Sequence, residues 1–144
     1  MPHRMVSSII EDQKITTCTA QLTVSKAAKL MQQNDIGAIM VTEQGRLVGI
    51  FTERDALFRL IAQGRDANST RVSEVMTRNP QCISPNKRFG HALHMMYEGG
   101  FRHVPVTRNG WPIGIISARS LLGPEFEQFA DEVRQREHIL EILG

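Results

Sequence analysis

The sequence predicts a mixed α/β (α+β) fold of two βαββα repeats packed on one another with pseudo-twofold symmetry. Two observations carry this prediction. The stretch GIFTERD at residues 49–55 returns as GIISARS at residues 114–120, sixty-five positions later. The stretch before each copy repeats at the same spacing, as VTEQG at residues 41–45 and VTRNG at residues 106–110. One repetition of this length indicates two similar modules rather than a solenoid array.

Composition places the chain among ordinary globular proteins and argues against several classes. It has 144 residues, of which 41% are hydrophobic and 22% charged. The formal charge of +2 is too small to indicate a nucleic-acid-binding surface. No apolar run approaches the roughly 20 residues of a membrane span, so we expect no membrane association. Two cysteines, Cys18 and Cys82, and no signal-like start indicate reduced thiols and a cytoplasmic location.

In the first repeat we expect a strand carrying Cys18 and then a helix that Ser25 caps, because its hydroxyl can accept from free amides of the first turn. Apolar residues at helical spacing give this helix a buried stripe of Ala27, Leu30 and Met31. The elements expected after the first strand are a helix over residues 26–33, strands over 37–41 and 47–51, and a helix starting at Thr52 and stopping at Gly64.

The second repeat shows the same order. Pro80 and Pro85 bracket an expected strand around Cys82, and a helix over residues 88–98 ends at two glycines. Asn109 and Gly110 between apolar runs predict a tight hairpin turn, since both residues adopt positive φ at low cost.

The predicted organisation has four parts. Residues 1–64 form the first repeat, 65–71 a polar surface linker, 72–123 the second repeat and 124–144 an amphipathic C-terminal helix. Two interpretations of that helix stay open: it covers one edge of the domain, or it packs against a second subunit.

The residues from Thr52 to Asp55 lie where a strand meets a helix, so free backbone amides are available there. Thr52 offers a hydroxyl, and the Asp55 carboxylate can accept two hydrogen bonds from a vicinal diol such as that of a ribose. A structural alternative is a capping box, in which a threonine cap and an acid three residues later stabilise the helix start.

The pattern Gly-x-apolar-x-Thr/Ser-x-x-Asp after a short hairpin, present twice in modified form, resembles the cystathionine-β-synthase (CBS) domain family. The resemblance covers nearly the whole chain and implies a tandem CBS-domain pair. Such a pair would be a regulatory module rather than an enzyme. It would bind an adenosine nucleotide or adenosyl compound (AMP, ADP, ATP, S-adenosylmethionine or NAD type) between the repeats and signal by conformational change. The resemblance also implies a homodimer; the module would pass its signal to an unknown protein partner.

The resemblance also assigns site residues. The ribose would be held by Asp55, with Thr52 near the phosphate or ribose. The second half of the pair would contribute the stretch from Thr77 to Cys82, with the Cys82 backbone at the adenine edge. From the residues entering its second strand, Arg102 and His103 would neutralise phosphate. Phe101 of the same stretch, or Ile50 of the first motif, would add apolar contact.

A second, mirror-related site would pair Ser117 and Ser120 with Ile36, Gly37 and Ala38. Ser120 stands where the first motif has Asp55, and a neutral hydroxyl is a weaker acceptor than a carboxylate. We therefore expect that site to be empty or weak.

Three other functions are alternatives. A scaffold of the same fold would act through dimerisation without any ligand, and Ser120 favours it slightly. A nucleic-acid-binding regulator has only the mild basic excess and the Arg102–His103 pair in its support. An enzyme is least expected, because no catalytic constellation, catalytic cofactor or metal site is indicated; His91 and His94 lack a third ligand.

Overall fold

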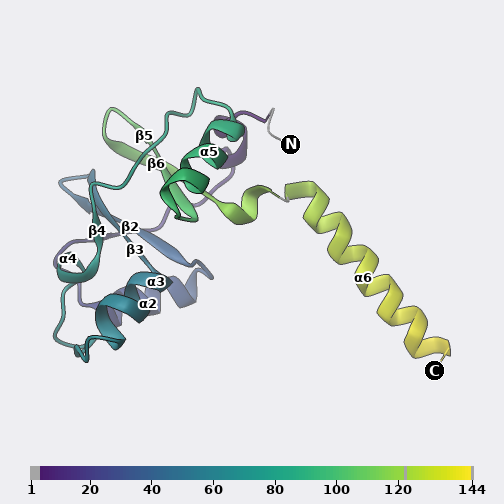
Figure 1. Ribbon diagram of the computed structural model, residues 1–144, viewed down its shortest axis with the longest axis horizontal. Coiled ribbons are helices and arrows are strands. Elements are labelled where there is room, and N and C mark those ends of the chain that lie inside the picture. The colour runs from purple at the N-terminus through teal and green to yellow at the C-terminus, as the bar shows by residue number, and fades with distance from the viewer. Residues whose placement is uncertain (1–3, 122, 144) are drawn as a thin grey trace.

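The computed structural model describes residues 4–121 and 123–143, with side chains outside residues 121–130 (Figure 1). It confirms a mixed α+β fold of two repeats. In the first repeat, a four-stranded sheet runs in the order β1 (Thr17–Thr19), β2 (Ala38–Glu43), β3 (Arg46–Thr52) and β4 (Thr77–Arg78). β1 is parallel to β2, and the other pairs are antiparallel.

Helices flank this sheet. α2 (Val24–Gln33) connects β1 to β2, and α3 (Glu53–Asp55) follows β3 and continues as a π-helix, Ala56–Ile61. Ala27 and Met31 of the predicted α2 stripe are buried. The predicted cap is wrong: Thr23 caps α2 by accepting from the Lys26 amide at 3.4 Å, two residues before Ser25. The left-handed stop at Gly64 is confirmed, with φ of 68°.

The second repeat has a two-stranded sheet of β5 (His103–Arg108) and β6 (Trp111–Ser117) preceded by α5 (Phe89–Gly99). Its hairpin turn is confirmed, with φ of 53° at Asn109 and 85° at Gly110. Both hairpins shift register at equivalent places, Val41/Thr42 and Val106/Thr107. The predicted strand around Cys82 is reduced to one bridge, from Ile83 to Val106. Proline offers no amide for a ladder, and two prolines flank this segment.

Each repeat takes a short helix from the other half of the chain. α4 (Val72–Val75) packs into the core around Phe51 and Ala27, whereas α1 (Val6–Ile10) packs into the core around Phe89 and Ile116. The two hydrophobic cores are therefore built by exchange of α1 and α4.

A side chain replaces a strand at the edge of β6. In the first repeat β4 pairs with β3 at Gly49 and Ile50. At the equivalent edge, the Gln13 amide nitrogen donates to the Ile115 carbonyl at 2.9 Å, and its oxygen accepts from the Ile115 amide at 2.7 Å. The carboxamide thus makes the two bonds that a peptide unit would make.

After a 3-10 helix (Ala118–Leu121), α6 (Gly123–Leu143) extends away from both repeats (Figure 1). A helix was predicted here, although Gly123 and Pro124 belong to its first turn. Leu140 and Leu143 are 68% and 78% exposed. The described side chains of α6 therefore do not bury their apolar face on the repeats, and packing against a second subunit stays a prediction.

Candidate functional site

The Asp55 carboxylate is buried at the end of β3, with the residue only 7% exposed. Its Oδ2 accepts from the backbone amide of Thr52 at 3.0 Å and from the Thr52 hydroxyl at 3.1 Å. The Asp55 amide donates in return to the Thr52 hydroxyl at 3.2 Å. This is the capping box that the sequence offered as the structural alternative. It holds the carboxylate in one orientation.

The other carboxylate oxygen of Asp55, Oδ1, interacts with side chains from β4 and from the π-helix. The Thr77 hydroxyl, on β4, donates to Asp55 Oδ1 at 3.3 Å. The Arg59 Nε lies 3.5 Å from the same oxygen, one helical turn on from Asp55, and an Arg59 Nη donates to the Met76 carbonyl at 2.9 Å. The structure therefore brings Thr52 and Thr77 into contact with the Asp55 carboxylate. Sequence analysis missed Arg59, although its spacing of four residues from Asp55 is the usual signal of a helical ion pair.

His103 begins β5 and pairs with Ser117 of β6. Burial lowers its pKa below the ordinary value of 6.5, the negative charge of Glu53 opposes that shift, and Arg102 adds to it. Glu53 belongs to α3, directly after Thr52, so the end of the first motif lies near the start of β5. Glu53 was not among the predicted site residues, although the two copies of the motif differ there, with Ala118 at the equivalent position.

The remaining predicted residues lie at different depths. Phe101 is partly buried and packs against the core of the second repeat, while the Arg102 side chain is exposed and its carbonyl accepts from the Ala118 amide at 2.9 Å. Cys82 is exposed, and its thiol donates to the Pro80 carbonyl at 3.2 Å. The contacts that the structure gives for Phe101 and Cys82 are with their own surroundings, and neither is among the groups that contact Asp55.

The mirror-related residues are arranged differently. Ser117 ends β6, and the Ser120 carbonyl in the 3-10 helix accepts from an Arg4 Nη at 2.6 Å, while the Arg4 guanidinium lies 4.9 Å from the centre of the Phe89 ring. Ile36 and Gly37 precede β2, and Ala38 pairs with Thr52. The Glu53 carboxylate occupies the space over Gly37.

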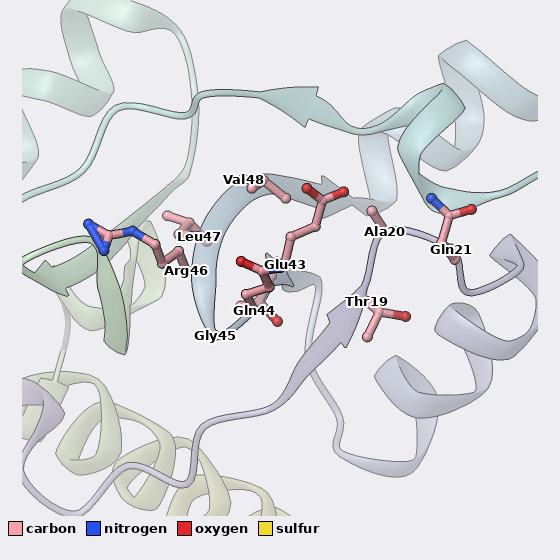
Figure 2. A pocket seen from close by; sticks show the side chains of 10 residues that line it. Thr19, Ala20, Gln21, Glu43, Gln44, Gly45, Arg46, Leu47 and Val48 are labelled. Atoms are coloured by element: carbon pink, nitrogen blue, oxygen red, sulfur yellow. The ribbon is translucent and has the colours of Figure 1, made fainter.

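An open hollow of about 720 Å³ lies at the opposite end of the first sheet (Figure 2). Residues 19–21, at the end of β1 and just after it, and residues 42–48, which join β2 to β3, line it. Arg46 at its rim donates to the Asn109 carbonyl at 3.2 Å and so joins the two hairpins. The motif residues Thr52 and Asp55 do not line this hollow.

Comparison with known proteins gives these features a family. The CBS domain model matches residues 6–62 and again residues 72–123. The chain therefore belongs to the CBS domain family, as a tandem pair. CBS pairs are regulatory ligand-binding modules.

Individual proteins agree with this assignment. The chain is 34% identical over 123 residues to the mitochondrial CBS domain-containing protein CBSX3 of Arabidopsis thaliana, covering 82% of this chain but 60% of that protein. A putative signal-transduction protein with CBS domains from Burkholderia ambifaria has the same fold, with a TM-score of 0.77, 33% identity, and coverage of 82% of this chain and 90% of its own.

A third protein shares the fold at lower identity. The CBS domain pair of protein MJ0100, solved in complex with 5′-methylthioadenosine and S-adenosyl-L-methionine, superposes with a TM-score of 0.75 at 23% identity, over 91% of this chain and 99% of its own.

Proposed function

We propose that this chain senses an adenosine nucleotide or adenosyl compound at Asp55, between its two repeats, and signals by a change in their arrangement. The observation that carries the proposal is the Asp55 carboxylate, which is buried, fixed in orientation by Thr52 and contacted by Thr77. A carboxylate oriented in advance can accept both hydroxyls of a ribose without paying to order itself. At the level of fold alone, the MJ0100 complex supports ligands of this class.

The coupling would run through Thr77. In the structure the Thr77 hydroxyl donates to Asp55 Oδ1 at 3.3 Å, and this is the longest of the hydrogen bonds to that carboxylate. A ribose hydroxyl that takes this position displaces Thr77, which lies on β4 directly after α4. Because α4 packs in the core of the first repeat, the displacement changes how the two halves fit together. The ligand shifts the equilibrium only as far as it prefers one arrangement.

Four further residues are proposed to contact the ligand. Arg102 and His103 would contact the ligand's 5′ substituent, Phe101 an apolar face and Cys82 the adenine edge. The site formed by Ser117, Ser120, Ile36, Gly37 and Ala38 would bind weakly or not at all.

A ligand-independent scaffold is the second candidate. The observation that favours it is that Asp55 accepts from Thr52 and Thr77 and contacts Arg59, so its buried charge is satisfied without a ligand. In that case the capping box is purely structural.

Thermal melting separates these two candidates. The protein is melted with AMP, ADP, ATP, S-adenosylmethionine and NADH, each at millimolar concentration. A ligand at 100 times its Kd adds about 2.7 kcal/mol, on the order of 10 °C for this chain length. A shift that Asp55→Ala abolishes supports the sensor. No shift with any ligand supports the scaffold, and a shift that survives Asp55→Ala places the site elsewhere.

We also propose a homodimer. Its support is an apolar face on the π-helix, where Leu57, Phe58 and Ile61 are 51%, 51% and 65% exposed. Sedimentation velocity tests it: the chain is expected at twice its monomer mass, and Ile61→Asp is expected to return it to a monomer. A wild-type chain that sediments as a monomer at high concentration contradicts the proposal.

The last parts of the proposal concern the cellular location of the protein, its lack of catalytic activity and its signalling partner. Among the described residues, no helix combines the length and apolarity that crossing a bilayer requires. Cys18 and Cys82 are both free thiols, which supports a reducing compartment and the proposed cytoplasmic location. We propose no catalytic activity and no catalytic cofactor, and we propose a protein partner rather than nucleic acid as the receiver of the signal.

A further inference from the structure

The hairpin turns of the two repeats are hydrogen-bonded to each other. The Leu47 amide, just after the first turn, donates to the Gly110 carbonyl of the second turn at 3.0 Å. An Arg46 Nη donates to the neighbouring Asn109 carbonyl at 3.2 Å. Figure 2 shows the Arg46 side chain pointing away from the other residues that line the hollow. The starts of β3 and β6 are therefore held together across the boundary between the repeats.

Two side chains cross this boundary in opposite directions. The Trp111 ring packs against Gly45, so that a β-carbon at residue 45 would overlap the ring. The Arg46 guanidinium lies over Gly110, with Nη2 3.2 Å from the place that a β-carbon would take. Arg46 and Trp111 are equivalent positions of the repeat, and so are Gly45 and Gly110. Each repeat therefore packs the residue after its turn glycine on the turn glycine of the other.

Residues 45–47 and 109–111, which we call the hairpin junction, restrict the angle at which the repeats meet. Two contacts related by the pseudo-twofold axis resist a rotation that a single contact would allow. Both turn positions require glycine, because φ is 80° at Gly45 and 85° at Gly110. A side chain at either position would also overlap or crowd the residue packed on it.

The hairpin junction and the candidate site lie at opposite ends of the same strand. β3 has 7 residues, from Arg46 to Thr52, and so spans about 20 Å. β6 likewise runs from Trp111 to Ser117. A small rotation at the junction therefore becomes a larger displacement where β3 ends. The angle at the junction thus also sets how the second repeat is placed relative to Asp55.

We infer that Arg46 and Trp111 are positioning residues that set the resting arrangement of the two repeats and, through it, the ligand affinity at Asp55. The second part of this inference rests on the proposed function. Packed on the opposite glycines, the two side chains favour the arrangement in which Thr77 donates to Asp55. A ligand that displaces Thr77 is opposed by these contacts, so loosening them raises the fraction of molecules that can bind.

Residual dipolar couplings measured by NMR test the first part without a ligand, because they report the orientation of each repeat separately. Gly45→Ala displaces the Trp111 ring and is expected to rotate one repeat against the other, while the couplings within each repeat still fit its own structure. Trp111→Ala leaves the turn unstrained and is expected to loosen the repeats, so that their alignment tensors differ in magnitude. Wild-type couplings in both variants overturn the inference.

Gly64→Ala is the matched control. Gly64 also has a positive φ, 68°, but a β-carbon there would meet nothing within 4 Å. Both alanines therefore carry backbone strain, and only the alanine at residue 45 displaces Trp111. Gly64→Ala should leave the orientation of the repeats as in the wild type. An equal rotation in this control would show that strain alone causes it, and would overturn the inference.

Tryptophan fluorescence checks the displacement itself. Trp111 is the only tryptophan of the chain and is 52% exposed, so acrylamide quenching reports on its ring alone. Gly45→Ala is expected to raise the quenching constant, because the ring loses its cover, and Gly64→Ala to leave it unchanged. Equal quenching in the wild type and Gly45→Ala would show that the ring does not pack on Gly45, which overturns the inference.

Titration calorimetry with AMP and S-adenosylmethionine tests the second part. Gly45→Ala and Trp111→Ala are expected to tighten binding of the probe by about fivefold, the lower end of the usual coupling between two sites. Gly64→Ala should leave the affinity unchanged, and Asp55→Ala should abolish binding. Wild-type affinities in both junction variants overturn the inference while the proposed function stands. If neither probe binds the wild type, the proposed function and the second part fall together, and the dipolar couplings still decide the first part.

Discussion

The Thr77 hydroxyl donates to the Asp55 carboxylate at 3.3 Å, although the two residues are 22 positions apart on either side of the polar stretch after Gly64. This bond ties β4 to the end of β3, so that the carboxylate and the exchanged helix α4 respond to each other.

Replacing Thr77 by valine removes the donor but keeps the side-chain volume. Thr77→Val is expected to lower the free energy of unfolding by about 1.5 kcal/mol, because a hydrogen bond to a charged group is lost; unfolding in urea measures this. In an Asp55→Ala background the same change should have nearly no effect. A double-mutant cycle measures this coupling, and two effects that simply add would contradict the bond.

The mirror-related site offers a gain of function. Ser120→Asp is expected to raise the calorimetric stoichiometry of adenosine from one to two per chain, since a carboxylate accepts more strongly than a hydroxyl. Arg4 already contacts the Ser120 carbonyl and would balance the new charge, as Arg59 does at Asp55. Ser120→Asn controls for shape without charge. A stoichiometry that stays at one would refute the prediction.

The pKa of His103 is lowered in the folded chain, mainly by burial, with Glu53 and Arg102 as the charges that face it. Between its folded pKa and the ordinary 6.5, the unfolded chain binds a proton that the folded chain does not. Stability from this group is therefore complete above about pH 6.5 and decreases as the pH falls through that window. Urea titrations across this range should show a smaller decrease for His103→Gln than for the wild type; equal slopes would contradict the assignment.

The two thiols should react at very different rates. Cys18 is 6% exposed, and burial raises its pKa to about 11, so it is neither accessible nor ionised near neutral pH. Cys82 is exposed. Iodoacetamide at pH 8 is expected to modify Cys82 in the native protein and Cys18 only after unfolding, as mass spectrometry of peptides would show. Cys82→Ser should leave the native chain unlabelled; rapid labelling of that variant would disprove burial of Cys18.

The repeat is what made the fold predictable. The offset of sixty-five positions fixed equivalent hairpins, and the turn at Asn109 and Gly110 has the positive φ angles that its residues favour. The wrong cap of α2 reflects two neighbouring residues that can both cap a helix. Thr23 and Ser25 are both good caps, and the contact of the Lys26 amide, not the residue type, selects Thr23.

Features that depend on tertiary contacts could not be predicted from the repeat or from residue spacing. α1 and α4 both begin with Val-Ser, at residues 6 and 72, but this similarity does not indicate which core each helix enters. Regular α-helical spacing would put Leu57, Leu60 and Ile61 on one face, whereas in the π-helix Leu60 is buried and Leu57 and Ile61 are exposed. At the site, the residue types of Thr52 and Asp55 predicted their contact. The position of Glu53 required knowing that Gly37 leaves room for its carboxylate.

The reciprocal placement of α1 and α4 means that cutting the chain in the polar stretch near residue 66 would not yield two autonomous folding units. Each fragment would lack a helix that its own core requires, and would leave valines such as Val6 or Val72 without their neighbours. Trimming the first dozen residues would likewise damage the distant half of the molecule first. We therefore expect the chain to unfold as one cooperative unit, in which ligand binding to one repeat also stabilises the other.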